Sequence, residues 1–163
     1  SNEYVSKALQ EGVDWSLDPR GIVTAVKNQG PHGYCGTFGR VECAEGQYAL
    51  HSGFTARNLS VEQLIDCVGW DRDQMPSLLG LPSAATPGLM AWEDYPYNIS
   101  KYSDSDPPIP GNPCRFDKSK VVSGYSGNIT NFTGVEASNG EDQFAAFIHH
   151  NGPVSGGINA NVF

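Results

Sequence analysis

Residues 29–35 read Gln-Gly-Pro-His-Gly-Tyr-Cys, a turn-forming run that ends in a cysteine. Apolar residues recur at helical spacing from Cys35 to about Leu50, which predicts a helix that begins at the cysteine. The N-terminus of a helix presents free N–H groups and the positive end of its dipole, and both stabilise the thiolate that a nucleophilic cysteine needs. Gln29 precedes the cysteine across the turn, where its side-chain amide and the Cys35 N–H could form an oxyanion hole. The alternative is a small, inert buried cysteine at a helix start.

The rest of the chain has a mixed α and β pattern. A capping box at residues 60–63 predicts a second helix, and residues 141–150 carry apolar side chains on one face and predict a third. Residues 21–26 and 153–158 are typical of strands. Residues 69–114 are irregular and rich in proline, and such a stretch inside a compact domain needs covalent or functional support.

Composition excludes several classes of function. The 163 residues carry a formal net charge of −8 and no cluster of lysine or arginine, so we do not expect a nucleic-acid partner. No apolar run approaches the roughly 18 residues that a membrane span needs. The cysteines lack the close spacing of a zinc site, and we expect neither a metal nor a cofactor. Sequons and cysteines together predict the secretory pathway, with an extracellular or lysosomal or vacuolar location; the sequons begin at Asn58, Asn98, Asn128 and Asn131.

Several segments, in the same order along the chain, resemble papain and the cathepsins, which are the papain-like cysteine peptidases. The segments are Val13-Asp14-Trp15, residues 21–30, residues 60–67, residues 93–97 and residues 152–155. The resemblance implies that Cys35 is the nucleophile and that Gln29 is the oxyanion donor. It also implies a set of substrate-binding residues: Gly33, Tyr34, Gly80, Leu81, Pro82, Gly157 and Ala160.

The same resemblance assigns the remaining cysteines and the fold. Cys67 and Cys114 match a family disulfide, which would staple the proline-rich residues between them, and Cys43 is interpreted as a buried free thiol. The implied fold is α+β and papain-like, in two lobes, and it is incomplete at the C-terminus. The lobes are a mainly helical one at residues 20–115 and a partial β-barrel formed by residues 116–163 with residues 1–19.

Departures from the family pattern keep two functions open. Gly36 follows the nucleophile where the family nearly always has tryptophan, and His32 stands where the family usually has a disulfide-bonded cysteine. The catalytic histidine and asparagine of the family lie roughly 130–150 residues after the nucleophile, which is beyond Phe163. His149 and His150 fall at the end of a helix that the family also has, where they are not catalytic.

The resemblance therefore predicts a papain-like cysteine endopeptidase that hydrolyses peptide bonds through a Cys35 thiolate and an acyl-enzyme. Its partner would be a polypeptide substrate or inhibitor. Its histidine and asparagine would come from a C-terminal continuation of the chain or from a second, light chain. The alternative is a catalytically inactive homologue that serves as a secreted structural or binding glycoprotein.

Overall fold

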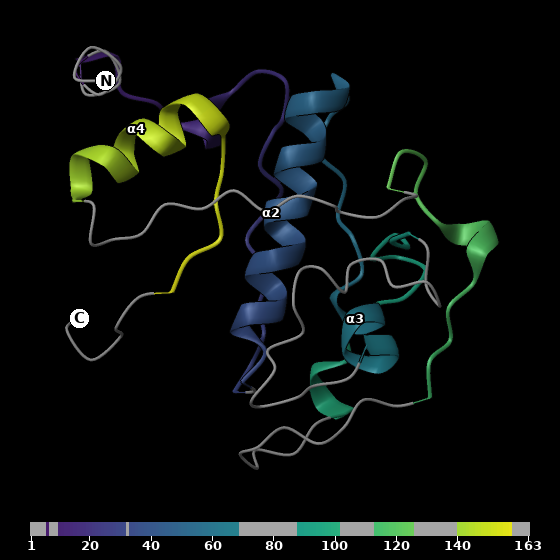
Figure 1. Cartoon of the computed structure of the whole chain (residues 1–163). Coiled ribbons are helices and arrows are strands. Elements are labelled where there is room, and N and C mark those ends of the chain that lie inside the picture. The colour runs from purple at the N-terminus through teal and green to yellow at the C-terminus, as the bar shows by residue number, and fades with distance from the viewer. Residues whose placement is uncertain are drawn as a thin grey trace.

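The computed structural model describes residues 6, 10–31, 33–68, 88–101, 113–125 and 140–157. These residues contain three α-helices: α2 (Cys35–Ser52), α3 (Val61–Val68) and α4 (Glu141–Asn151). They also contain three short 3-10 helices: η1 (Trp15–Leu17), η3 (Ile99–Lys101) and η4 (Lys118–Lys120). Helix α2 runs through the middle of the molecule, with α3 on one side and α4 on the other (Figure 1). None of these described helices is long and apolar enough to cross a membrane.

Helix α2 begins at the predicted residue and ends at Ser52, slightly later than predicted. Its buried face includes Phe38, Val41 and Ala49, which follow one another at helical spacing. Gly53 ends the helix with a φ of 75°, in the left-handed region, and donates its N–H to the Ala49 carbonyl at 3.2 Å. The C-terminal end of α2 therefore follows from local sequence.

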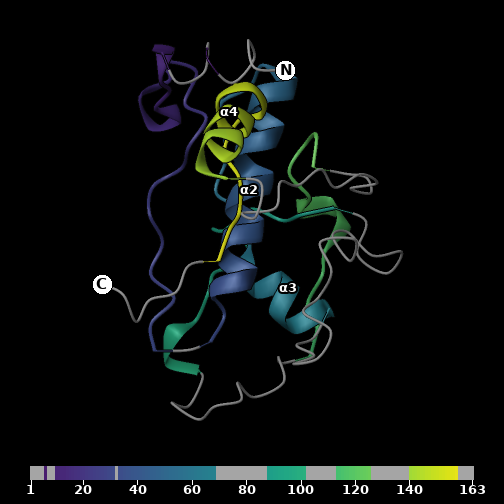
Figure 2. The same ribbon diagram turned by 60° about the vertical axis from the view of Figure 1, so that its left-hand side comes forward.

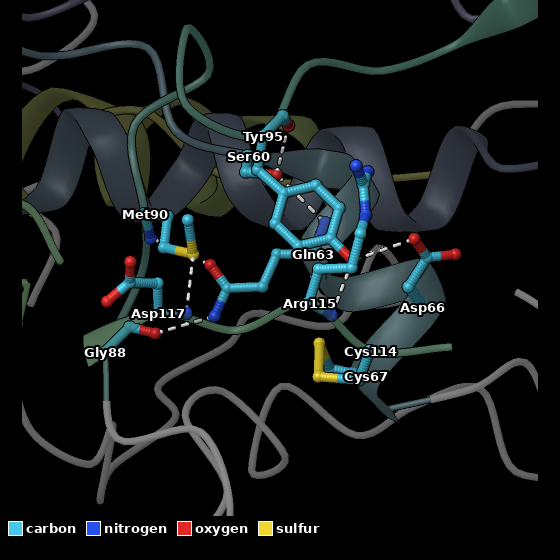
Figure 3. Close-up of a disulfide and its surroundings, with 10 residues drawn as sticks. All are labelled: Ser60, Gln63, Asp66, Cys67, Gly88, Met90, Tyr95, Cys114, Arg115 and Asp117. Atoms are coloured by element: carbon cyan, nitrogen blue, oxygen red, sulfur yellow. Dashed lines mark hydrogen bonds between the residues drawn. A yellow bond between two sulfur atoms is a disulfide. The ribbon is translucent and has the colours of Figure 1, made fainter. Parts of the chain in front are cut away.

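Helix α3 confirms half of the predicted capping box. Ser60 accepts the Gln63 backbone N–H on its Oγ at 2.9 Å. A capping box also predicts that the Gln63 side chain accepts the Ser60 backbone N–H. This prediction is wrong, because the Gln63 side chain bonds to a neighbouring segment. Its Nε2 donates to the Gly88 carbonyl at 2.9 Å, and its Oε1 accepts the Met90 N–H at 2.8 Å (Figure 3). The side chain thus satisfies two buried backbone groups that would otherwise lack partners from secondary structure.

One apolar core lies between α2, α3 and two further segments. Its buried members are Tyr34, Phe38, Val41, Leu59, Val61, Leu64, Ile65, Leu89, Ala91, Val122 and Tyr125. Strand-type pairing among the described residues consists of two isolated antiparallel bridges, Leu59 with Ala91 and Met90 with Val121. Residues 121–125 therefore pack in the same core as the helices. The division of the chain into two lobes stays a prediction.

The strands predicted at residues 21–26 and 153–158 are absent from the part of those segments that the structure describes. Both segments instead lie beside α2 without regular secondary structure (Figures 1 and 2). Gln47 of α2 donates from its Nε2 to the carbonyl oxygens of Asn151 and Pro153, at 2.8 and 2.9 Å. The Gln47 side chain thus binds the carbonyl of Pro153, a residue that was predicted to lie in a strand.

The first described residues contact α4. The Trp15 Nε1–H donates to the Ile148 carbonyl at 3.0 Å, and the His149 Nε2 lies 3.5 Å from a carboxylate oxygen of Glu11. Residues near the start of the described chain therefore pack against its last described helix.

A disulfide joins the end of α3 to a later segment of the chain. Cys67 and Cys114 are bonded, with their Cα atoms 4.6 Å apart, and this is the pairing that the resemblance implied. Beside the disulfide, the Tyr95 hydroxyl donates to Asp66 at 2.9 Å and accepts the Arg115 N–H at 3.1 Å (Figure 3). The Arg115 guanidinium lies over the Tyr95 ring, 4.4 Å from its centroid. The covalent link is thus accompanied by a polar cluster that holds the same two parts of the chain together.

Candidate active site

Cys35 is the first residue of α2, and it is exposed. Tyr34 precedes it as the N-cap, and no side chain forms a capping hydrogen bond at this end of the helix. The Tyr34 carbonyl accepts the N–H groups of Thr37 and Phe38, at 2.9 and 3.0 Å. The first turn carries no acidic residue. The positive end of the helix dipole therefore acts on the Cys35 thiol without a carboxylate in that turn to offset it.

Gln29 lies in a tight turn ahead of α2. The Asn28 side-chain oxygen accepts the Gly30 N–H at 2.8 Å, and Gly30 has a φ of 67° that favours glycine. The Gln29 carbonyl accepts a hydrogen bond from the Tyr97 hydroxyl at 2.9 Å. The turn is therefore held both by its own side chain and by a residue distant in sequence.

The structure brings Gln29 and Cys35 together on one open cleft of about 480 Å³. Residues 22–29 contribute one wall, α2 contributes the floor, and residues 153–156 contribute the other wall. Both segments come close to α2 at Gly46, where an added Cβ would lie 3.3 Å from the Ile22 carbonyl oxygen and 3.3 Å from the Pro153 side chain. A substrate in this cleft would have access to the exposed thiol at the helix start.

Cys43 lies further along α2 and borders the same cleft. It is a free, half-buried thiol that donates to the Pro153 carbonyl at 3.7 Å, and burial raises its pKa. Gly39, one turn earlier, leaves room for the opposite wall, because a Cβ there would come 2.8 Å from the Ser155 Oγ. The interpretation of Cys43 as a free thiol is confirmed. Its environment makes it the less reactive of the two free cysteines at neutral pH.

A buried ion pair, missed from sequence alone, ties the first wall of the cleft to α2. The Glu45 carboxylate accepts Lys27 Nζ at 2.8 Å, Thr24 Oγ1 at 2.6 Å and the Leu59 N–H at 2.7 Å. Only 6% of the Lys27 side chain and 1% of the Glu45 side chain are exposed. The sequence could have indicated this pair, because Glu45 lies at helical spacing from Phe38 and Val41, on the face of α2 that is buried.

The predicted substrate-binding residues fall into three groups. Gly33 and Gly157 are exposed, and Gly157 directly follows the second wall of the cleft. Tyr34 is fully buried, its ring lies 6.5 Å from that of Tyr97, and burial raises its pKa to about 12. Tyr34 therefore presents no surface to the cleft, and its substrate-binding role stays a prediction. The third group lies outside the described residues: Gly80, Leu81, Pro82 and Ala160.

Three other residues singled out from sequence also lie outside the described chain: His32, Asn128 and Asn131. The other two sequon asparagines, Asn58 and Asn98, are exposed.

An exposed cysteine at the start of a central helix, with a glutamine on the same cleft, is the arrangement expected of a cysteine peptidase. Residues 9–163 match the family described as papain family cysteine protease, and the chain belongs to that family.

Named relatives agree with this assignment. Cysteine proteinase 15A of Pisum sativum is 36% identical over 157 residues, which cover 93% of this chain and 40% of that protein. Cathepsin F of Mus musculus is 33% identical over 153 residues, which cover 90% of this chain and 29% of that protein. The chain thus spans at most two fifths of either relative.

A solved structure supports the fold. Digestive procathepsin L 3 of the Tenebrio molitor larval midgut matches 90% of this chain and 49% of its own chain, with a TM-score of 0.56 and 23% identity. The described helices therefore belong to a papain-like fold of which this chain forms only a part.

Proposed function

We propose that this chain is the nucleophile-bearing part of a papain-like cysteine endopeptidase. The observation that carries the proposal is the shared cleft: Cys35 lies exposed at the uncapped start of α2, and Gln29 borders the same space. A helix start presents free N–H groups at the nucleophile, and the Gln29 amide is the second donor of the proposed oxyanion hole.

The proposed reaction proceeds in two steps. The Cys35 thiolate adds to the scissile carbonyl carbon, and the oxyanion accepts hydrogen bonds from the Gln29 side chain and the Cys35 N–H. The C–N bond then breaks, the amine leaves with a proton, and a thioester remains on Cys35. Water adds to the thioester, and the acid and the free thiol are released.

The proton transfers require a base that the described cleft does not contain. We place the histidine and its orienting asparagine beyond residue 163, in the same polypeptide or in a second chain. The match covers 40% and 29% of the two relatives named above, so most of each relative lies outside the matched stretch. A polypeptide would be the substrate or the inhibitor of the completed site.

We also propose that the protein passes through the secretory pathway to an extracellular or lysosomal or vacuolar site. The disulfide between Cys67 and Cys114 supports an oxidising compartment. Asn58 and Asn98 are exposed, as glycan acceptors must be. Glycopeptide mapping of the native protein is expected to find glycans on at least two of its four sequons. Four unmodified sequons would contradict this route.

Peptide hydrolysis by the natural protein tests the proposed chemistry. Cys35→Ser is expected to abolish turnover of a fluorogenic peptide. Gln29→Ala is expected to lower kcat about a hundredfold with little change in KM, because it removes a donor that acts on the transition state. Glu93→Gln, at an exposed side chain away from the cleft, is the control and should leave turnover unchanged. A wild-type protein that cleaves no peptide would instead favour the inactive binding glycoprotein.

A further inference from the structure

Tyr97 links the two elements that carry the candidate catalytic groups. Its hydroxyl donates to the Gln29 carbonyl at 2.9 Å. Its ring packs edge-on against Phe38 in the first turn of α2, with the ring centroids 5.0 Å apart. The same ring lies edge-on to Tyr34, the N-cap of that helix, at 6.5 Å. One side chain therefore contacts both the glutamine turn and the helix start.

Aromatic neighbours hold this side chain in place. The Trp92 ring lies 6.4 Å from that of Tyr97 and 6.5 Å from that of Phe38. Offset and edge-on aromatic pairs stabilise their mutual geometry beyond the area that they bury. The Tyr97 hydroxyl is therefore presented to the turn from a packed cluster and not from a mobile loop residue.

The hydroxyl also stays a donor under the conditions in which a peptidase works. Burial raises the pKa of Tyr97 to about 12, and the Tyr34 hydroxyl and the Glu62 carboxylate add to this rise. A phenol whose pKa lies that high keeps its proton at neutral and acidic pH. The hydrogen bond to the Gln29 carbonyl thus does not depend on pH in that range.

The residues on either side of Gln29 are held by contacts of their own. Lys27, two residues earlier, is held to α2 through Glu45. After it, the turn bonds to itself through Asn28 and Gly30. The bond from Tyr97 acts on the peptide of Gln29 itself, and a small displacement of a donor from its productive position lowers the rate steeply.

We infer that Tyr97 is a positioning residue for the oxyanion hole: its hydroxyl fixes the Gln29 peptide relative to the Cys35 N–H. This inference rests on the proposed peptidase function. Tyr97 does not line the cleft, and its hydroxyl acts through the Gln29 peptide.

Tyr97→Phe in the natural, full-length protein provides the test, because it removes one oxygen and keeps the ring. Tyr48→Phe is the matched control, since it removes a hydroxyl that donates to the Ser123 carbonyl at 3.3 Å, away from the cleft. Steady-state kinetics on a fluorogenic peptide are normalised to the amount of Cys35 that iodoacetamide titrates, and circular dichroism of each variant measures any unfolded fraction. The rate of Cys35 alkylation is measured in parallel, because alkylation forms no oxyanion.

Tyr97→Phe is expected to lower kcat about tenfold, with KM and the alkylation rate within about twofold of wild type. Tyr48→Phe is expected to leave all three unchanged. A Tyr97→Phe enzyme with the wild-type kcat, or one in which only KM changes, would overturn the positioning role and leave the peptidase proposal standing. A kcat loss shared equally by both variants would overturn it too. A wild-type protein without turnover would overturn the peptidase proposal and, with it, this inference.

Discussion

Glu45 shows how a single buried carboxylate can hold the site's framework. Its three donors are Lys27, Thr24 and the Leu59 N–H. The first two lie in the segment before α2, and Leu59 lies in the segment after it. An unpaired charge in such a place costs several kcal/mol, so the lysine and the glutamate each depend on the other. Lys27 also lies 3.6 Å from Glu42, which borders the cleft. The pair thus fixes the segment that leads to Gln29.

Replacing Glu45 by glutamine is expected to lower the free energy of unfolding by about 3 kcal/mol, because Lys27 would stay buried without its closest counter-charge. Urea denaturation with the disulfide intact measures the change. Glu93→Gln is the control, since it breaks an ion pair with Arg57 whose side chains are 65% and 54% exposed, and it should cost below about 1 kcal/mol. Equal losses in the two variants would show that the Glu45 pair contributes no more than a surface pair.

The two free cysteines should differ in reactivity. Cys35 is exposed at the start of α2, whereas burial raises the pKa of Cys43 and leaves less thiolate at a given pH. Iodoacetamide is expected to label Cys35 first at pH 6 to 7, and Cys43 only as the pH rises above the ordinary cysteine value of about 8.5. Peptide mass spectrometry over a pH series measures both rates. Slow, equal labelling of the two thiols would argue against an activated Cys35.

At the scale of single elements, the sequence predicts features that depend on neighbouring residues and misses those that depend on contacts between residues far apart in the chain. Helix α2 could be predicted because its limits depend on Cys35 and Gly53, within the helix or next to it. Gln47 donates to the Pro153 carbonyl at a sequence separation of 106, and the Tyr97 bond to Gln29 spans 68 residues. Residue types and spacing carry no record of such pairs. The predicted strands failed for that reason.

Helix α4 offers a test of what its terminal glycines do. Gly140 and Gly152 flank the helix with φ values of 94° and 93°, so alanine at either position would adopt a strained backbone. A Cβ at Gly140 would meet nothing within 4 Å, whereas one at Gly152 would collide with the Leu50 side chain of α2. Gly140→Ala is expected to cost about 1–3 kcal/mol of stability, and Gly152→Ala about 1–3 kcal/mol more. Urea denaturation of both variants measures the difference, and equal costs would show that the Leu50 side chain does not restrict position 152.

At the scale of the whole molecule, the site is assembled from parts that lie far apart in the chain. The cleft needs residues 22–29, the first turns of α2 and residues 153–156 at once. None of the described histidines borders it. His51 lies in the last turn of α2, roughly 24 Å along the helix from Cys35 at 1.5 Å per residue. His149 faces Glu11 at 3.5 Å and packs against His150.

The last prediction concerns the source of the base. Residues 1–163 alone are expected to react with iodoacetamide at Cys35 and yet to cleave no peptide, because alkylation needs only the thiolate whereas acyl transfer needs an imidazole to protonate the leaving amine. The protein completed by the proposed continuation or second chain is expected to do both. The comparison uses one fluorogenic peptide, with protein amounts matched by Cys35 titration and with Cys35→Ser of each form as the blank. Cysteine-dependent cleavage by residues 1–163 alone would place the base within the chain, and His32, next to the nucleophile in sequence, would be the first residue to replace.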